Sequence, residues 1–185
     1  MHMLSAEHRQ LLHTLARSSI EHGLKTGEAL EIDIADYPAE LQQKQATFVT
    51  LHRNKQLRGC IGILEAMRPL AEDIAYNAWA AAFSDSRFMP LRPDELDGLD
   101  IHISILGTPE EMDFRSEDDL LLQIRPGKDG LILEEGHNRG TFLPSVWESL
   151  TEPREFLNHL KLKAGLPANH WSDSIRVKRY SVEEF

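Results

Sequence analysis

Cysteine is almost absent from this sequence: Cys60 is the only one among 185 residues. A single cysteine excludes a framework of disulfide bonds within the chain. It also excludes an iron–sulfur cluster held by the chain's own thiolates, because such a cluster takes several cysteines. Low cysteine usage is typical of proteins in the reducing cytosol, so we expect a cytoplasmic protein.

Long apolar runs are absent as well. No stretch approaches the roughly 20 residues that a membrane-spanning helix needs. The first residues, Met1–Ser5, lack the charged region and apolar core of a secretory signal. Hydrophobic residues make up 41% of the chain and charged residues 27%, as in ordinary soluble globular proteins. We therefore expect no membrane association and one domain over residues 1–185, with or without a division into two lobes.

The sequence also has few basic residues relative to acidic ones, 20 against 30, which gives a formal net charge of −10. The acidic excess is local, because residues 94–119 contain ten acidic residues and one basic residue, Arg115. The rest of the chain has 20 acidic and 19 basic residues. Solvated loops and helix caps account for most such clusters, although a partner-binding acidic surface is the alternative. The overall sign argues against nucleic-acid binding.

Several motifs for catalysis and binding are also missing. The sequence has no phosphate-binding glycine loop and no serine between spaced glycines of the kind that forms a nucleophile elbow. Its nine histidines are scattered, and none belongs to a two-histidine helical metal motif. No metal site is predicted, although one assembled from distant residues stays open. The sequence indicates neither a cofactor nor a substrate.

Hydrophobic periodicity predicts two long helices. One covers residues 5–22, with Ser5 as its N-cap and Gly23 at its end. The other covers residues 69–83 and begins at a proline. Shorter helices are predicted over residues 116–124, 144–150 and 153–164, and residues 26–43 are expected to be irregular with one helical turn.

Hairpins alternate with these helices. Residues 46–51 and 58–62 are predicted to pair through a turn at 53–56. The other predicted strands cover residues 99–106, 130–134, 140–143 and 175–181, with a hairpin loop at 135–139. This order favours an α+β fold with mainly antiparallel sheets and flanking helices, and a doubly wound α/β fold is the weaker alternative.

The stretch Leu57–Gly62 holds the single cysteine between two glycines. In a strand, Arg58, Cys60 and Gly62 would point to one face, and an arginine on the thiol's face would favour the thiolate. Gly59 and Gly62 indicate that a backbone or a ligand approaches closely. Two interpretations remain open: a chemical site at the thiol, or a cysteine packed as a small hydrophobe in a tight strand.

A second unusual stretch follows the helix over 69–83. Arg87 could hold an anionic group with both arms of its guanidinium, and Asp85 could orient that arginine or act as a base. The structural alternative is that these residues end the helix and anchor a loop. His102, in an alternating strand, is either a packed histidine or a base.

Together these stretches resemble the AMMECR domain family, called protein A of the AmmeMemoRadiSam system in prokaryotes. The resemblance covers nearly the whole chain beyond about residue 45, and the cysteine stretch is its specific part. Met89 stands where the family commonly has a second proline. The matching pieces are Leu57–Gly62, Asp85–Phe88 with Pro90–Leu91, Ile103–Leu106, Asp129–Glu134, Gly140–Pro144 and Lys163–Pro167.

The resemblance implies an α+β fold in two lobes and a cytosolic protein. It also implies association with a Memo-type protein, itself similar to non-haem iron dioxygenases, and with a radical S-adenosylmethionine enzyme. It transfers no assigned reaction, but it singles out Arg58 and Cys60 with their flanking glycines.

The sequence therefore leaves two functions open. The first is an enzyme or enzyme subunit with a small-molecule site, in which Cys60 is the nucleophile or thiol donor and Arg58 stabilises the thiolate or an anion. Candidate substrate-binding residues are Gly59, Gly62, Asp85, Arg87 and His102, of which Asp85 or His102 is also a possible base. The alternative is a non-catalytic adaptor module for the two partners.

Overall fold

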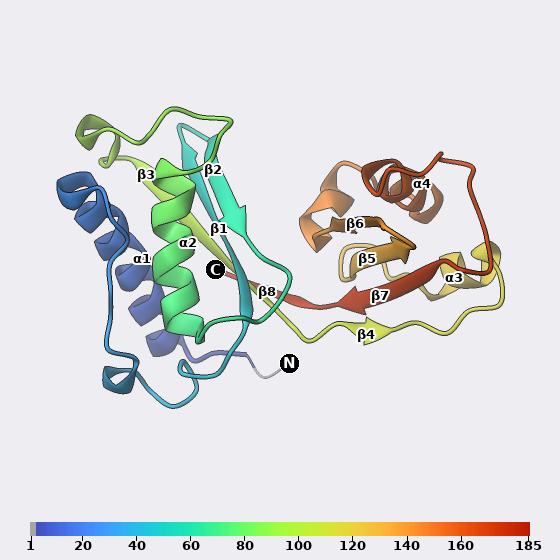
Figure 1. Cartoon of the computed structure of the whole chain (residues 1–185), viewed down its shortest axis with the longest axis horizontal. Coiled ribbons are helices and arrows are strands. Elements are labelled where there is room, and N and C mark those ends of the chain that lie inside the picture. The colour runs from blue at the N-terminus through green and yellow to red at the C-terminus, as the bar shows by residue number, and fades with distance from the viewer. Residues whose placement is uncertain (1–2) are drawn as a thin grey trace. The chain divides into compact units, whose positions relative to one another are not determined.

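The computed structural model describes residues 3–185 and divides into two compact units (Figure 1). The first unit runs to Leu106 and also includes Glu183–Phe185, and the second is Gly107–Val182. Each unit contains helices and one antiparallel four-stranded sheet, so the predicted α+β fold is confirmed. The prediction that the two units form one two-lobed domain stays a prediction. The expectation of no secretory signal rests partly on Met1 and His2, which lie outside the described residues.

The first unit contains one sheet with strand order β2-β1-β3-β8. Helices α1 and α2 lie side by side, and α2 packs on β1 and β2 while α1 packs on β3 (Figure 1). Short 3-10 turns connect the elements at η1 (Ile34–Asp36) and η2 (Pro93–Glu95). The bounds of the other elements are α1 Ala6–Thr26, β1 Ala46–Arg53, β2 Gln56–Gly62, α2 Leu70–Phe83, β3 Leu99–Leu106 and β8 Val182–Glu184.

The prediction for the end of α1 was wrong by one turn. Ser5 caps the helix as expected, accepting a hydrogen bond from the His8 amide, but the helix continues to Thr26. Gly27 ends it with a φ of 83°, a conformation that favours glycine. Gly23 lies inside the helix. Its lack of a side chain serves packing, because the rings of Trp79 and Phe83 occupy the space that a Cβ would need.

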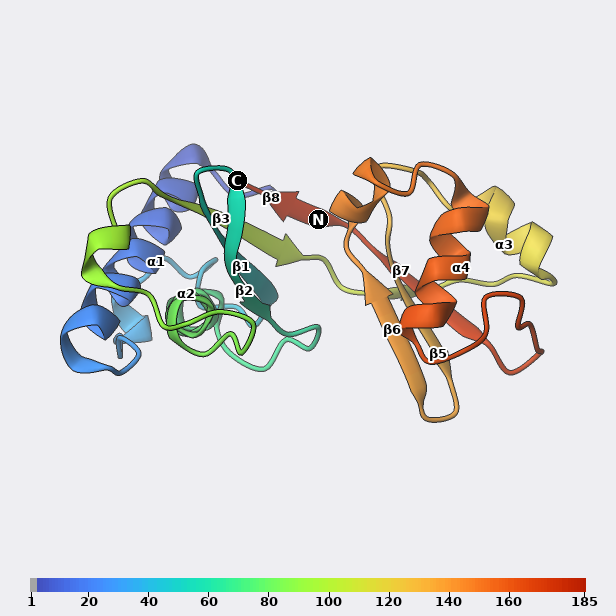
Figure 2. The same cartoon turned by 90° about the horizontal axis from the view of Figure 1, so that it is seen from above.

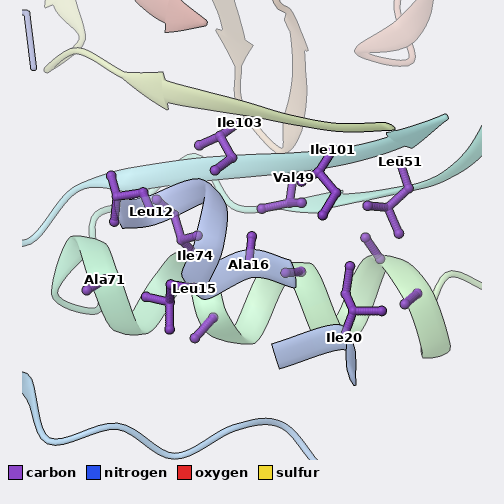
Figure 3. Packing of buried hydrophobic residues seen from close by; sticks show 14 of the residues in the cluster. Leu12, Leu15, Ala16, Ile20, Val49, Leu51, Ala71, Ile74, Ile101 and Ile103 are labelled. Carbon is purple, nitrogen blue, oxygen red and sulfur yellow. The ribbon is translucent and has the colours of Figure 1, made fainter. Parts of the chain in front are cut away.

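The core of the first unit lies between the two helices and the sheet (Figure 3). Ala16 and Ile20 of α1 and Ile74 of α2 pack against the strands, where Val49 and Ile103 are fully buried. On β1, Val49 and Leu51 face the helices while Phe48, Thr50 and His52 alternate with them. The sheet therefore has one apolar face and one face with polar side chains, which we call the outer face.

The second unit contains the sheet β4-β7-β5-β6. Its helix α4 packs beside β6 (Figure 2). Trp147 and Phe156 stack with ring centroids 3.8 Å apart in the core of this unit. The elements are β4 Glu110–Glu111, α3 Glu117–Gln123, β5 Gly130–Glu135, β6 Asn138–Phe142, η3 Pro144–Glu148, α4 Pro153–Lys163 and β7 Arg176–Tyr180.

Two predictions for the second unit need correction. The hairpin loop is shorter than predicted, because Glu135 pairs with Asn138 and leaves Gly136 and His137 as the turn, with a φ of 58° at the glycine. The helical segment predicted over residues 144–150 is a 3-10 helix and ends two residues earlier, at Glu148. The short strands β4 and β8 were not predicted, since two or three residues carry no readable alternation.

Candidate functional site

The two glycines of the Leu57–Gly62 motif let backbone segments approach closely. A Cβ at Gly59 would lie 2.0 Å from the carbonyl oxygen of Ala81 in α2. A Cβ at Gly62 would lie 2.2 Å from the carbonyl oxygen of Thr47 in β1. Both distances are far below van der Waals contact, so both positions need glycine for packing. A role for either glycine in substrate binding stays a prediction.

Cys60 is half-buried and belongs to the outer face of the sheet. It is paired with Thr50 of β1. The amide and carbonyl of Cys60 bond to side chains outside the sheet rather than to β1, so Cys60 and Thr50 form a non-hydrogen-bonded pair. In antiparallel sheets the side chains of such pairs lie closer together than those of hydrogen-bonded pairs. The Thr50 Oγ1 atom accordingly lies 3.1 Å from the Cys60 Sγ atom. Sequence reasoning missed Thr50, because a regular hairpin register would have placed it opposite Gly59 rather than Cys60.

Thr50 is also paired with His102 on its other side, in β3. Cys60, Thr50 and His102 therefore form a row across three adjacent strands of the outer face. The ring of His102 is exposed and meets the ring of His52 edge-on, with centroids 5.1 Å apart. We call these four residues the thiol face. It brings a thiol, a hydroxyl and two imidazoles to one surface.

Asp85 and Arg87 act on the backbone of Cys60. The Cys60 amide donates a hydrogen bond of 2.9 Å to Asp85 Oδ2, and Arg87 Nη2 donates one of 3.3 Å to the Cys60 carbonyl oxygen. The two side chains also form an ion pair, with Arg87 Nη2 2.7 Å from Asp85 Oδ2. We call this pair the edge clamp, because it satisfies the amide and carbonyl of Cys60 that point away from β1.

The edge clamp holds the Asp85 carboxylate in its charged form. Hydrogen bonds from the Arg87 guanidinium, and then from the amides of Cys60 and Arg87, keep the pKa of Asp85 well below its usual range despite its burial. The predicted pairing of Asp85 with Arg87 is thus present in the structure. An anion-binding role for Arg87 and a base role for Asp85 stay predictions.

Arg58 is bound to a carboxylate that sequence reasoning did not single out. Its Nε and Nη2 atoms donate to the two oxygens of Glu95 in η2, each at 2.9 Å. The Glu95 side chain is 9% exposed, and the Arg58 hydrogen bond is the main cause that lowers its pKa to about 2. Among residues 3–185, the structure gives no contact between the Arg58 guanidinium and the Cys60 thiol, so the thiolate-stabilising role of Arg58 stays a prediction.

Within residues 3–185, no three side chains of the metal-ligating kinds gather closely enough to hold an ion. Over the same residues, no helix combines the length and apolar character that a membrane crossing requires.

Comparisons with known proteins agree with this architecture. A protein of Thermofilum pendens is 39% identical over 197 residues, covering 100% of this chain and 92% of the relative. A protein of Thermotoga maritima is 41% identical and covers 90% of this chain and 91% of the relative. The crystal structure of the uncharacterized protein PH0010 from Pyrococcus horikoshii matches with a TM-score of 0.85 at 37% identity, over 94% of this chain and 88% of that one. The AMMECR1 family model matches residues 13–185, and the chain belongs to the AMMECR1 family.

Proposed function

We propose that this chain is an enzyme, or a subunit of one, in which Cys60 attacks an electrophilic atom of a small molecule bound at the thiol face. The observation that carries the proposal is the 3.1 Å contact between Thr50 Oγ1 and Cys60 Sγ at a half-buried position. A hydroxyl that donates to the sulfur stabilises the thiolate, which is the nucleophilic form of cysteine.

The surrounding residues support this role in two ways. The edge clamp fixes the backbone of Cys60 on both its amide and its carbonyl, so the sulfur has a defined position. His102 lies two strands away from Cys60, about 10 Å between backbones, so we assign it a proton-accepting role through the Thr50 hydroxyl or the substrate rather than by direct contact.

The rate at which iodoacetamide alkylates Cys60 tests this proposal, because the chain has no other thiol. In the native protein near pH 7 we expect faster alkylation than in the urea-unfolded chain. Replacing Thr50 by valine should slow the native reaction about fivefold, because the reactive thiolate loses one stabilising hydrogen bond. Thr14→Val, which removes an exposed hydroxyl of α1, is the control. A native thiol that reacts more slowly than the unfolded one, with no effect of Thr50→Val, would contradict the proposal.

The setting that we propose follows the resemblance to protein A of the AmmeMemoRadiSam system. The chain would act in the cytoplasm with a Memo-type protein and a radical S-adenosylmethionine protein. A lone thiol without a disulfide suits that compartment.

A non-catalytic adaptor for the same partners is the second candidate. The observation that favours it is the exposure of large apolar side chains at Leu57 and Met89, next to the arginines of the motif and of the edge clamp. Co-elution with the Memo-type protein in size-exclusion chromatography separates the two functions. For an adaptor, Leu57→Ser with Met89→Ser should abolish co-elution, and Leu122→Ser, at an exposed leucine of the second unit, should not. Unchanged co-elution of the double variant would count against the adaptor.

A further inference from the structure

A pocket of about 270 Å³ lies beside the motif and is separate from the thiol face. It is formed within the first unit, where the edge strand β2 meets the loop that leads to η2. The residues that line it are Arg58, Phe88, Met89, Pro90, Arg92 and Glu95. Its size suits a small molecule or one end of a larger one.

Positive charge exceeds negative charge around this pocket. Arg53 and Arg58 both approach Glu95, with Arg53 Nη1 3.5 Å from its carboxylate, and the Arg92 amide donates to the same carboxylate. Among residues 3–185, the Arg92 guanidinium is paired with Asp94 alone, and both side chains are exposed. Three guanidinium groups, of Arg53, Arg58 and Arg92, therefore lie near only two carboxylates, those of Glu95 and Asp94. The chain as a whole, by contrast, has a formal net charge of −10. A local surplus of cations in an acidic protein favours a negatively charged ligand.

Arg58 is also positioned rigidly and has an unused donor. Glu95 holds two of its three nitrogens, so the guanidinium plane is fixed. The third, Nη1, is buried and has no hydrogen-bond partner among residues 3–185. A buried guanidinium N–H without an acceptor is unfavourable. A ligand that moved the side chains covering Nη1 and brought an oxygen within reach of it would remove that cost.

The other wall of the pocket is apolar. The Phe88 ring lies near two arginines, Arg58 of the pocket and Arg87 of the edge clamp. The ring centroid is 6.0 Å from the guanidinium carbon of Arg58 and 5.5 Å from that of Arg87. Met89 is 81% exposed at the rim, so its side chain can adjust around a ligand. Through Phe88 and Arg87, the pocket adjoins the edge clamp that holds Cys60.

We propose that this pocket binds a small organic oxyanion, a carboxylate or a phosphate ester, with its charge between Arg58 and Arg92 and a short apolar or aromatic group against Phe88. As the anionic part of the substrate, this ligand rests on the function proposed above. As a binding site, the pocket stands on its own.

The test is an NMR titration of the native, nitrogen-15-labelled chain, in which the resonances of residues 86–95 are followed. The probes are benzoate, phenyl phosphate, neutral benzamide and inorganic phosphate. We expect saturable binding of benzoate or phenyl phosphate, about tenfold tighter than that of benzamide. Tighter binding of phenyl phosphate than of benzoate identifies the phosphate ester as the ligand class, and the reverse order identifies the carboxylate.

Variants of exposed residues keep the test independent of folding. Arg92→Gln should weaken binding about fivefold. Arg154→Gln removes an arginine that is also exposed and is paired with Asp118, and it should change binding less than about twofold. Arg58→Lys is a further variant at a mostly buried position; it keeps the charge but loses the planar fork, so it should also weaken binding provided that it folds as the native chain does. Equal binding of benzoate and benzamide, inorganic phosphate binding as tightly as phenyl phosphate, or equal losses in Arg92→Gln and Arg154→Gln would overturn the proposal.

The NMR titration and the iodoacetamide assay, both carried out on the native chain, separate this inference from the proposed function. Saturable binding together with an inert native thiol leaves the oxyanion site in place and overturns the thiol chemistry. A reactive thiol together with no saturable binding overturns the oxyanion site alone.

Discussion

Gly59→Val is expected to destabilise the first unit by more than about 4 kcal/mol, enough to prevent folding of a domain of ordinary stability. The new Cβ would lie 2.0 Å from the Ala81 carbonyl oxygen, and that oxygen belongs to helix backbone, which cannot move aside as a side chain can. Helix α2 would have to leave the sheet, and its buried residues Ala78, Ala81 and Ile74 would lose their packing. Urea unfolding, or loss of soluble protein, measures the effect.

Gly136→Asn is the matched control for this substitution. Gly136 has a positive φ of 58° but no atoms within 4 Å of the position of its Cβ. Asparagine tolerates that conformation better than other residues do, so the change should cost less than about 1 kcal/mol. If Gly59→Val folded with a stability close to that of Gly136→Asn, α2 and β2 would not be packed as closely as the structure places them.

Asp85→Ala is expected to cost about 3 kcal/mol of unfolding free energy. The Asp85 side chain is only 5% exposed, and it accepts hydrogen bonds from the Cys60 amide and from the amide and guanidinium of Arg87. Removing it leaves these donors without their acceptor. Because the clamp positions the cysteine, the alkylation rate of Cys60 should change in the same variant.

The cost of replacing Asp85 should also depend on pH. The pKa of the Asp85 carboxyl is held below its usual range, mainly by the Arg87 guanidinium, so its contribution to stability is complete above the unfolded-state pKa of about 4. The contribution is lost as the pH falls towards the folded-state pKa. The stability difference between the native chain and Asp85→Asn should therefore be largest near neutral pH and shrink in acid.

Asp94→Asn is the control for both effects. Asp94 and Arg92 form a similar two-pronged pair two residues apart, but their side chains are 66% and 69% exposed. A pair in full contact with solvent contributes little. We expect little change in stability and no pH-dependent difference from Asp94→Asn. Equal effects at Asp85 and Asp94 would mean that the edge clamp is an ordinary surface ion pair.

The sequence alone predicted the elements that carry a clear period. Helices α1 and α2 were identified because apolar residues recur at helical spacing over many positions, and the β1–β2 hairpin because a β-prone stretch is followed by a turn. The site was predicted only in part. Cys60, Asp85 and Arg87 do meet, but Glu95 lies 37 residues from Arg58, and only the path of the loop between α2 and β3 brings them together.

Thr50 was missed for a different reason. Its place beside Cys60 depends on the strand register, and the register of β1 and β2 shifts at a bulge between Leu51 and His52. A bulge adds one residue to one strand, and no residue type marks it reliably in the sequence. Alternation along one strand therefore gave the correct face for the cysteine, but it could not identify the neighbour across the hairpin.

The edge clamp has a consequence for how separate copies of the chain behave. Strand β2 is the last strand of its sheet, and an unpaired strand edge is a template on which another molecule can add its own strand. Asp85 and Arg87 occupy the amide and carbonyl of Cys60 at the middle of that edge. We therefore expect the two side chains that position the thiol also to oppose aggregation through intermolecular β-pairing.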